Sequence, residues 1–242
     1  MEQESFISGA GHGAAPGRLG LRTICVIPVH NEEKTIQGIV KETRQYVDNV
    51  IVVDDGSTDR SSQEATAGGA KVFRIDRNQG VGAAYRKGLD IARQHDAEIV
   101  LRLDGDGQHY PSDIPNLIEP ILKDEADIVL GHRVNYFASS SWIMRLGNWG
   151  LTKLTNAVTG ANVQDSQTGL KAIRTSALDG FDLTANRYEI ESEIIFEAKR
   201  RGLRLKEVAV KYDKYVPGVT VWCGVRVGVF MILKALRKRP QA

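Results

Sequence analysis

This sequence of 242 residues has few cysteines, no large surplus of either charge and few long apolar runs. Two cysteines are too few for a disulfide framework, so we expect a protein of a reducing compartment. The 32 Lys and Arg residues nearly balance the 30 Asp and Glu residues, so net charge gives no reason to expect nucleic-acid binding. A membrane-spanning helix needs about 20 apolar residues. The apolar stretch at 219–233 is shorter and is interrupted by Arg226.

The two ends of the chain differ in composition from the middle. Residues 1–21 are rich in Gly and Ala and lack an apolar core, which predicts a disordered leader and not a signal peptide. We expect one domain over residues 22–215. The tail over 216–242 has an apolar stretch and then basic residues (Lys234, Arg237, Lys238 and Arg239), which favours an interfacial helix attracted to anionic lipid. The alternative is an element docked on the core.

Short apolar runs alternate with helical patterns along most of the chain. Strands are expected at residues 23–28, 49–53, 72–75, 98–103, 126–131 and 205–210. Helices are expected at residues 36–47, 80–95, 142–158 and 188–198. This alternation predicts an α/β fold with a mostly parallel sheet and helices on both faces. Ligands of such sheets bind beyond the carboxyl ends of the strands, where acidic residues follow three of the expected strands.

The most informative of these strand ends is Asp104-Gly105-Asp106-Gly107-Gln108. In an extended segment, Asp104 and Asp106 would project from the same side, and Gln108 could add a neutral oxygen there. Two or three such oxygens suit Mg²⁺ or Mn²⁺ and leave coordination positions open for a diphosphate. The alternative is a solvated hairpin turn, for which Asp-Gly pairs are common.

The second half of the chain is less regular. Apolar residues, among them Trp142 and Trp149, recur at helical spacing over 142–158 with few charges. This pattern fits either a core-facing helix or an apolar groove or wall that faces a membrane. A polar loop is expected over residues 164–171.

Six short motifs, taken in order, resemble those of family 2 glycosyltransferases of GT-A fold, and most of all the dolichyl-phosphate mannose and glucose synthases. They are Pro28-Val29-His30-Asn31-Glu32, Val52-Val53-Asp54-Asp55-Gly56-Ser57, Asn78-Gln79-Gly80, Asp104-Gly105-Asp106-Gly107-Gln108-His109, Gly131-His132-Arg133 and Asp165-Ser166-Gln167-Thr168-Gly169. The resemblance covers roughly residues 22–215. It implies a single GT-A domain that binds a nucleotide sugar.

The resemblance also implies roles for individual residues. The nucleoside would lie against Pro28, His30, Glu32, Asp54 and Asp55, and Asp104 and Arg133 would also contact the donor. Asp104, Asp106 and Gln108 would hold Mg²⁺ or Mn²⁺ against the diphosphate. Together with Asp165, the residues Asp104, Asp106 and Arg133 are the expected catalytic set. Candidates for binding acceptor phosphate are Arg145, Lys171, Lys211 and Lys214. If the acceptor is a hydroxyl, the general base is expected among Asp165, Glu189 and Glu191.

The expected reaction is metal-dependent transfer of a hexosyl group, with inversion, from a nucleotide sugar to polyprenyl phosphate. GDP-mannose, UDP-glucose and a UDP-N-acetylhexosamine remain open as donors. The alternatives are a saccharide hydroxyl as acceptor, or a noncatalytic protein that binds nucleotide sugars. We expect a peripheral protein on the cytoplasmic face of a membrane, held there directly or by a membrane-anchored partner.

Overall fold

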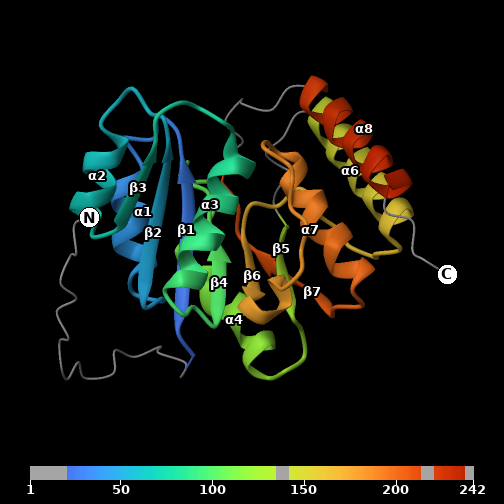
Figure 1. The fold of residues 1–242 in the computed structure, drawn as a ribbon, viewed down its shortest axis with the longest axis horizontal. Helices are drawn as coiled ribbons and strands as arrows, with labels where there is room; N and C mark the ends of the chain where they lie inside the picture. The colour runs from blue at the N-terminus through green and yellow to red at the C-terminus, as the bar shows by residue number, and fades with distance from the viewer. Residues whose placement is uncertain (1–20, 135–141, 214–220, 238–242) are drawn as a thin grey trace.

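The core of the protein is one sheet of seven strands, in a computed structural model that describes residues 21–134, 142–213 and 221–237 (Figure 1). The strand order is β3-β2-β1-β4-β6-β5-β7. The strands are β1 (Thr23–Val29), β2 (Asn49–Asp55), β3 (Lys71–Ile75), β4 (Ile99–Arg102), β5 (Ile128–Arg133), β6 (Lys171–Arg174) and β7 (Leu205–Val210). Strand β6 runs antiparallel to β4 and β5, and the other described pairs are parallel.

Helices cover both faces of this sheet, because its central strands are apolar on both sides. Every residue of β1 is buried. On one face lie α3 (Val81–Gln94) and α7 (Glu189–Arg200), and on the other lie α1 (Ile36–Thr43), α2 (Ser61–Gly68) and α4 (Ile114–Leu122). Two short 3-10 turns, η1 (Pro111–Asp113) and η2 (Thr175–Leu178), complete the connections. The predicted single α/β domain with a mostly parallel sheet is confirmed.

Two further helices, α6 (Trp142–Thr159) and α8 (Val221–Arg237), lie side by side at the end of the molecule away from β3 (Figure 1). Helix α8 also packs on α7, where Phe196, Val227 and Met231 form a small apolar cluster. Lys234 is buried there, donates to the carbonyl oxygen of Asp182 at 2.6 Å and is paired with Glu193. The expectation that Lys234 belongs to the basic end attracted to anionic lipid is therefore wrong, because Lys234 pairs with the Glu193 carboxylate inside the helix interface. Lys238 and Arg239 lie outside the described residues.

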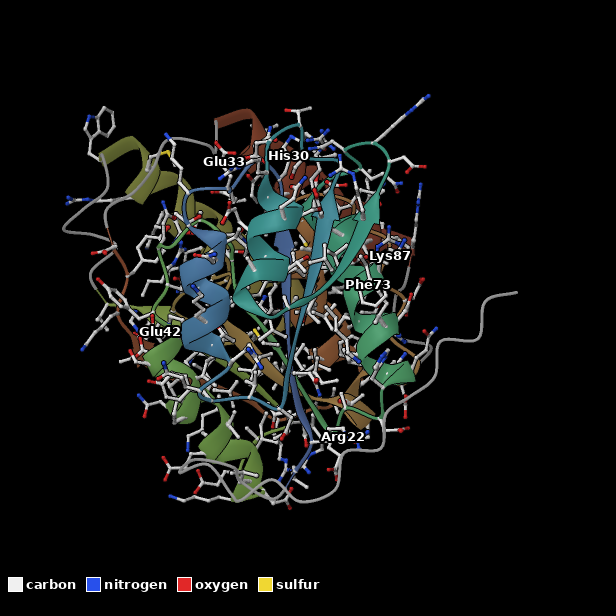
Figure 2. The ribbon with its side chains drawn as sticks, turned by 90° about the vertical axis from the view of Figure 1, so that its left-hand side faces the viewer. Arg22, His30, Glu33, Glu42, Phe73 and Lys87 are labelled. Carbon is white, nitrogen blue, oxygen red and sulfur yellow. The ribbon has the colours of Figure 1, made fainter. Side chains whose placement is uncertain are left out.

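The parallel strands direct the functional loops to one edge of the sheet. Figure 2 places Arg22 and His30 at opposite ends of β1, and the loops after β2, β4, β5 and β7 leave from the His30 end. Strand β6 was not expected from the sequence, which placed Lys171 in a loop. Because β6 is antiparallel, it begins at this same edge, with Lys171 paired to Arg102 of β4.

None of the helices within the described ranges combines the length and the apolar character needed to cross a bilayer.

Candidate functional site

A cavity of about 830 Å³ lies at the carboxyl edge of the sheet. Residues at the carboxyl ends of β1, β2, β4 and β5 line this cavity. The acidic residues after the expected strands predicted a shared site at this edge. Nine of the candidate site residues predicted from the sequence line it: Pro28, His30, Glu32, Asp55, Asp104, Asp106, Gln108, Arg133 and Glu191.

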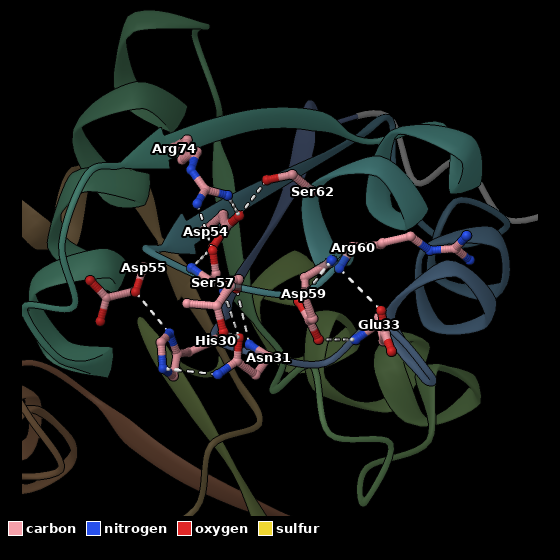
Figure 3. A network of polar contacts seen from close by, with 12 residues as sticks. His30, Asn31, Glu33, Asp54, Asp55, Ser57, Asp59, Arg60, Ser62 and Arg74 are labelled. Atoms are coloured by element: carbon pink, nitrogen blue, oxygen red, sulfur yellow. Dashed lines mark hydrogen bonds and ion pairs between the residues drawn. The ribbon is translucent and has the colours of Figure 1, made fainter.

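The loop after β1 is shaped by Asn31, which has a left-handed backbone with φ of 61°. Asparagine tolerates this conformation better than most residues. Its side-chain oxygen accepts from the Thr58 backbone N–H at 2.8 Å and so ties this loop to the loop after β2 (Figure 3). His30 Nδ1 lies 2.9 Å from the Asp55 carbonyl oxygen. A carbonyl can only accept, so Nδ1 donates this bond.

The neighbouring residues Asp54 and Asp55 point in different directions at the end of β2: Asp54 lies toward Arg74, and Asp55 lies toward His30 (Figure 3). Asp54 is buried behind the cavity wall, where it accepts from the Ser57 N–H at 2.8 Å and pairs with Arg74 at 2.8 Å. Although burial opposes ionisation, hydrogen bonds from Ser57 and Ser62 and the charge of Arg74 lower the pKa of Asp54. Asp55 lines the cavity and accepts from the backbone N–H groups of Gln79 and Gly80 at 2.8 and 2.7 Å. Of the two, Asp55 is the one placed to contact a ligand.

Two more carboxylates, Asp104 and Asp106, follow β4 and face the same cavity. Asp104 pairs with Arg102 at 3.0 Å, and this cation outweighs burial and lowers the pKa of Asp104. Burial and the negative charges of Asp104 and Glu32 raise the pKa of Asp106 to about 7. The site thus concentrates negative charge that a bound cation would neutralise.

The third oxygen of the expected metal site belongs to Gln108. Its side-chain oxygen accepts from the Tyr212 hydroxyl, and its backbone N–H donates to Asp106 at 3.0 Å. Within the part of the chain that the structure describes, no cluster of three or more His, Cys, Asp or Glu side chains could hold a metal ion. Two carboxylates with an amide oxygen nevertheless fit Mg²⁺ or Mn²⁺, since these ions prefer oxygen and leave positions for substrate phosphate.

Gly169 packs directly on the carboxylate of Asp104, and a Cβ added there would overlap Asp104 Oδ2. We expect Gly169→Ala to turn this carboxylate away and lower turnover about 100-fold, because small displacements of reacting groups carry such costs. Circular dichroism should show an unchanged fold. Gly38→Ala on α1, where an added Cβ meets nothing within 4 Å, is the matched control and should retain full turnover. Equal activity of the two variants would contradict the close packing.

Below the cavity, a buried network of charges joins β4, β6 and α7. Glu191 pairs with both Arg102 and Lys171, and the Arg102 guanidinium lies 5.1 Å from the centre of the Tyr85 ring. Arg102 and Lys171 are at most 2% exposed. Lys171, a predicted phosphate ligand, is buried in an ion pair with Glu191 and is not among the cavity-lining residues. Arg102 and Glu191 do line the cavity. Arg102 was missed, although a lone arginine in an apolar strand was a signal for it.

Arg133, at the end of β5, is fixed from two sides. Its Nε and Nη2 donate to the two carboxylate oxygens of Asp165 at 2.6 and 2.9 Å. Arg133 outweighs the effect of burial and lowers the pKa of Asp165. On its other side, the guanidinium lies 5.0 Å from the centre of the Tyr212 ring. Arg133 reaches the cavity while Asp165 lies behind it.

The remaining basic candidates are more dispersed. Arg145 is half-buried on α6, and Lys211 is exposed just after β7, with its backbone N–H donating to Asp113 at 2.8 Å. Lys214 lies outside the described residues. Glu189, a predicted alternative base, pairs with Arg226 of α8 at 3.3 Å.

The far wall of the cavity is apolar and comes from α6 and α8. Its side chains include Leu146, Leu151 and Leu154 of α6 and Val225 and Val227 of α8. The sequence of residues 142–158 suggested either a core-facing helix or an apolar groove. Helix α6 does both, because it packs on α7 and α8 and also lines the apolar part of the cavity. A carboxylate-rich end and an apolar end therefore share one cavity.

The comparisons with known proteins agree with this geometry. The family model Glycosyl transferase family 2 matches residues 24–181. A UDP-N-acetylglucosamine–dolichyl-phosphate N-acetylglucosaminyltransferase of Methanococcus voltae is 34% identical over 240 residues, covering 88% of this chain and 96% of that one. A polyprenol monophosphomannose synthase of Mycolicibacterium smegmatis is 27% identical over 246 residues, covering 93% and 90%.

Solved structures with the same fold include glucosyl-3-phosphoglycerate synthase of Mycobacterium tuberculosis in complex with phosphoglyceric acid. Its TM-score is 0.74 at 21% identity, covering 92% of this chain and 82% of that one. The same synthase has also been crystallised with Mg²⁺ and UDP, and with Mn²⁺, UDP and phosphoglyceric acid. The fold is thus that of GT-A enzymes. With the family model spanning most of the sheet, the chain belongs to glycosyl transferase family 2 and is a glycosyltransferase.

Proposed function

We propose that this enzyme transfers a hexosyl group from a nucleotide sugar to a polyprenyl phosphate at a membrane surface. The observation that carries this proposal is the single cavity with carboxylates at one end and the apolar wall of α6 and α8 at the other. Such a cavity suits a polar donor that meets an acceptor with a hydrocarbon tail. The names of the relatives from Methanococcus voltae and Mycolicibacterium smegmatis support the same acceptor class.

At the polar end, Pro28, His30, Glu32 and Asp55 would hold the nucleoside, because carboxylates accept from base N–H and ribose hydroxyl groups. Asp104, Asp106 and Gln108 would hold Mg²⁺ or Mn²⁺. A divalent cation bound there would offset the charge that develops on the departing nucleoside diphosphate. Asp54 would act from behind this wall by fixing the loop that carries Asp55.

Arg133 would bind the acceptor phosphate, since a guanidinium held by Asp165 presents its remaining N–H groups in a fixed direction. A phosphate oxygen then attacks the anomeric carbon as the bond to the donor diphosphate breaks, which inverts the configuration. No proton has to be removed, because this oxygen is already anionic. The two carboxylates Asp165 and Glu191 are both ion-paired, Asp165 with Arg133 and Glu191 with Arg102 and Lys171. A carboxylate paired with a cation is a poor base, which supports an acceptor that needs no general base.

The outer faces of α6 and α8 would rest on the membrane. Trp149 is 54% exposed, and Ile232 and Leu236 are 47% and 59% exposed. Exposed Trp and aliphatic side chains on neighbouring helices fit the interface of an anionic bilayer, and α8 also carries the exposed Arg226 and Arg237. We place this membrane face on the cytoplasmic side.

A triple variant, Trp149→Gln with Ile232→Gln and Leu236→Gln, tests this orientation. These three side chains are exposed and stand apart from the cavity lining. We expect flotation with vesicles of phosphatidylcholine and phosphatidylglycerol to fall at least about 10-fold, since each removed side chain forfeits roughly 1.5–3 kcal/mol of apolar burial. Nucleotide binding in detergent should not change. If the unaltered chain does not float, recruitment by a membrane-anchored partner replaces direct binding.

The donor is identified by a panel of GDP- and UDP-sugars, each incubated with Mn²⁺ or Mg²⁺ and a short polyprenyl phosphate. We expect one nucleotide sugar to give nucleoside diphosphate at a rate that depends on both the metal and the lipid. Turnover that requires a saccharide hydroxyl and ignores the lipid phosphate would overturn the proposed acceptor.

A further inference from the structure

The short segment after β7 is joined to the loop that carries the carboxylates. His109 and Tyr212 form an isolated antiparallel bridge, and the Asp213 N–H donates to the Gln108 carbonyl oxygen at 2.9 Å. The Tyr110 hydroxyl donates to Asp213 at 2.7 Å. These contacts fix Tyr212 against the loop over residues 106–110.

Two groups of the proposed site meet at the Tyr212 side chain, which is 9% exposed. Its hydroxyl donates to Gln108 Oε1 and is also hydrogen-bonded with the Arg133 side chain. Its ring lies below the Arg133 guanidinium, with 5.0 Å from the Arg133 Cζ to the ring centre. The His109 ring packs on it edge to face, with 5.0 Å between the ring centroids. One residue therefore contacts both the proposed metal ligand Gln108 and the proposed phosphate ligand Arg133.

The hydrogen bond from the Tyr212 hydroxyl determines the orientation of the Gln108 side-chain amide. An amide oxygen has two lone pairs, so it can accept from Tyr212 and still coordinate a cation. Without this donor, the amide could present its NH₂ group to the cation site. Partners that orient a metal ligand in this way typically contribute 10- to 100-fold to metal affinity or activity.

We propose that Tyr212 is a positioning residue whose hydroxyl orients Gln108 for metal binding and whose ring orients Arg133 for phosphate binding. This inference rests on the proposed function, since it takes Gln108 as a metal ligand. It separates two roles within one side chain. Tyr212→Phe removes the hydroxyl bonds to Gln108 and Arg133 but keeps the ring against the Arg133 guanidinium, whereas Tyr212→Leu removes both the hydroxyl and the ring.

The test is a titration of the full-length protein with Mn²⁺ in the presence of UDP or GDP, with free Mn²⁺ read by electron paramagnetic resonance. We expect Tyr212→Phe to weaken Mn²⁺ binding about 10-fold or more. In turnover assays, the KM for polyprenyl phosphate should rise less for Tyr212→Phe, which keeps the ring against Arg133, than for Tyr212→Leu. Tyr46→Phe is the matched control, because Tyr46 packs against the core outside the cavity lining, and the Mn²⁺ affinity of this variant should not change.

A double-mutant cycle guards against a merely structural effect. In a Gln108→Ala background, Tyr212→Phe should cause no further loss of Mn²⁺ affinity, because the two changes act through one bond. An equal loss in both backgrounds, or Tyr212→Phe with unaltered Mn²⁺ affinity, would overturn the inference while the metal site stands. If the unaltered protein binds no Mn²⁺ with either nucleotide, the metal site itself is wrong.

Discussion

Asp106→Asn should abolish sugar transfer without weakening the fold. Losing one of two carboxylate ligands removes several kcal/mol of metal stabilisation, so we expect turnover to fall about 1,000-fold. In the metal-free protein, the neighbouring charges of Asp104 and Glu32 disfavour ionised Asp106. The uncharged amide relieves this repulsion, and the free energy of unfolding should stay the same or rise.

The measurement is turnover against metal concentration, together with urea denaturation of the metal-free protein. Asp90→Asn on the exposed side of α3 is the matched control and should keep full turnover. An Asp106→Asn protein that retains full activity and the original metal dependence would remove Asp106 from the metal site. A variant that is inactive but also destabilised would make Asp106 a structural residue.

Glu191→Gln should give the largest loss of stability. This change keeps the side-chain shape but leaves Arg102 and Lys171, both buried, without their shared carboxylate. Removing one partner from a buried ion pair typically costs about 3–5 kcal/mol, because the remaining charge is left uncompensated. Urea denaturation should show a loss of this size in the free energy of unfolding.

The matched control for this loss is Glu119→Gln, which breaks an exposed pair with Lys123 in which both side chains are 58% exposed. Exposed pairs contribute about 0–1 kcal/mol, so this variant should be nearly as stable as the original protein. If Glu191→Gln is equally stable but loses transfer to a hydroxyl acceptor, then Glu191 is a general base and the buried network is not structural.

The polar half of the site could be predicted because it depends on local sequence. Apolar runs that end in acidic or polar residues mark the carboxyl ends of parallel strands, and these ends share one edge. The structure brings Asp55, Asp104 and Asp106 to one cavity on this basis. Strand β4 ends at Arg102, so Asp104 and Asp106 reach the cavity from the segment that follows the strand.

The other half depends on contacts between segments far apart in sequence. Strand β6 has four residues and follows a polar loop, so its short apolar core gave no strand signal. The roles of Asp54 and Lys171 were set by Arg74 and Glu191, neither of which a local pattern connects to them. The apolar cavity wall requires α6 and α8 to be adjacent, although more than 60 residues lie between the end of α6 and the start of α8. Helical periodicity identifies an apolar face but does not say what it covers.

The most direct test of the account compares polyprenyl phosphate with the matching polyprenol as acceptor, with the donor that the nucleotide-sugar panel selects. Products are read by mass. We predict a lipid heavier by one hexosyl group from polyprenyl phosphate, formed only with Mg²⁺ or Mn²⁺, and none from polyprenol. A glycosylated polyprenol, or a glycosylated saccharide with no lipid product, would contradict the central claim that this cavity joins a sugar to a lipid phosphate.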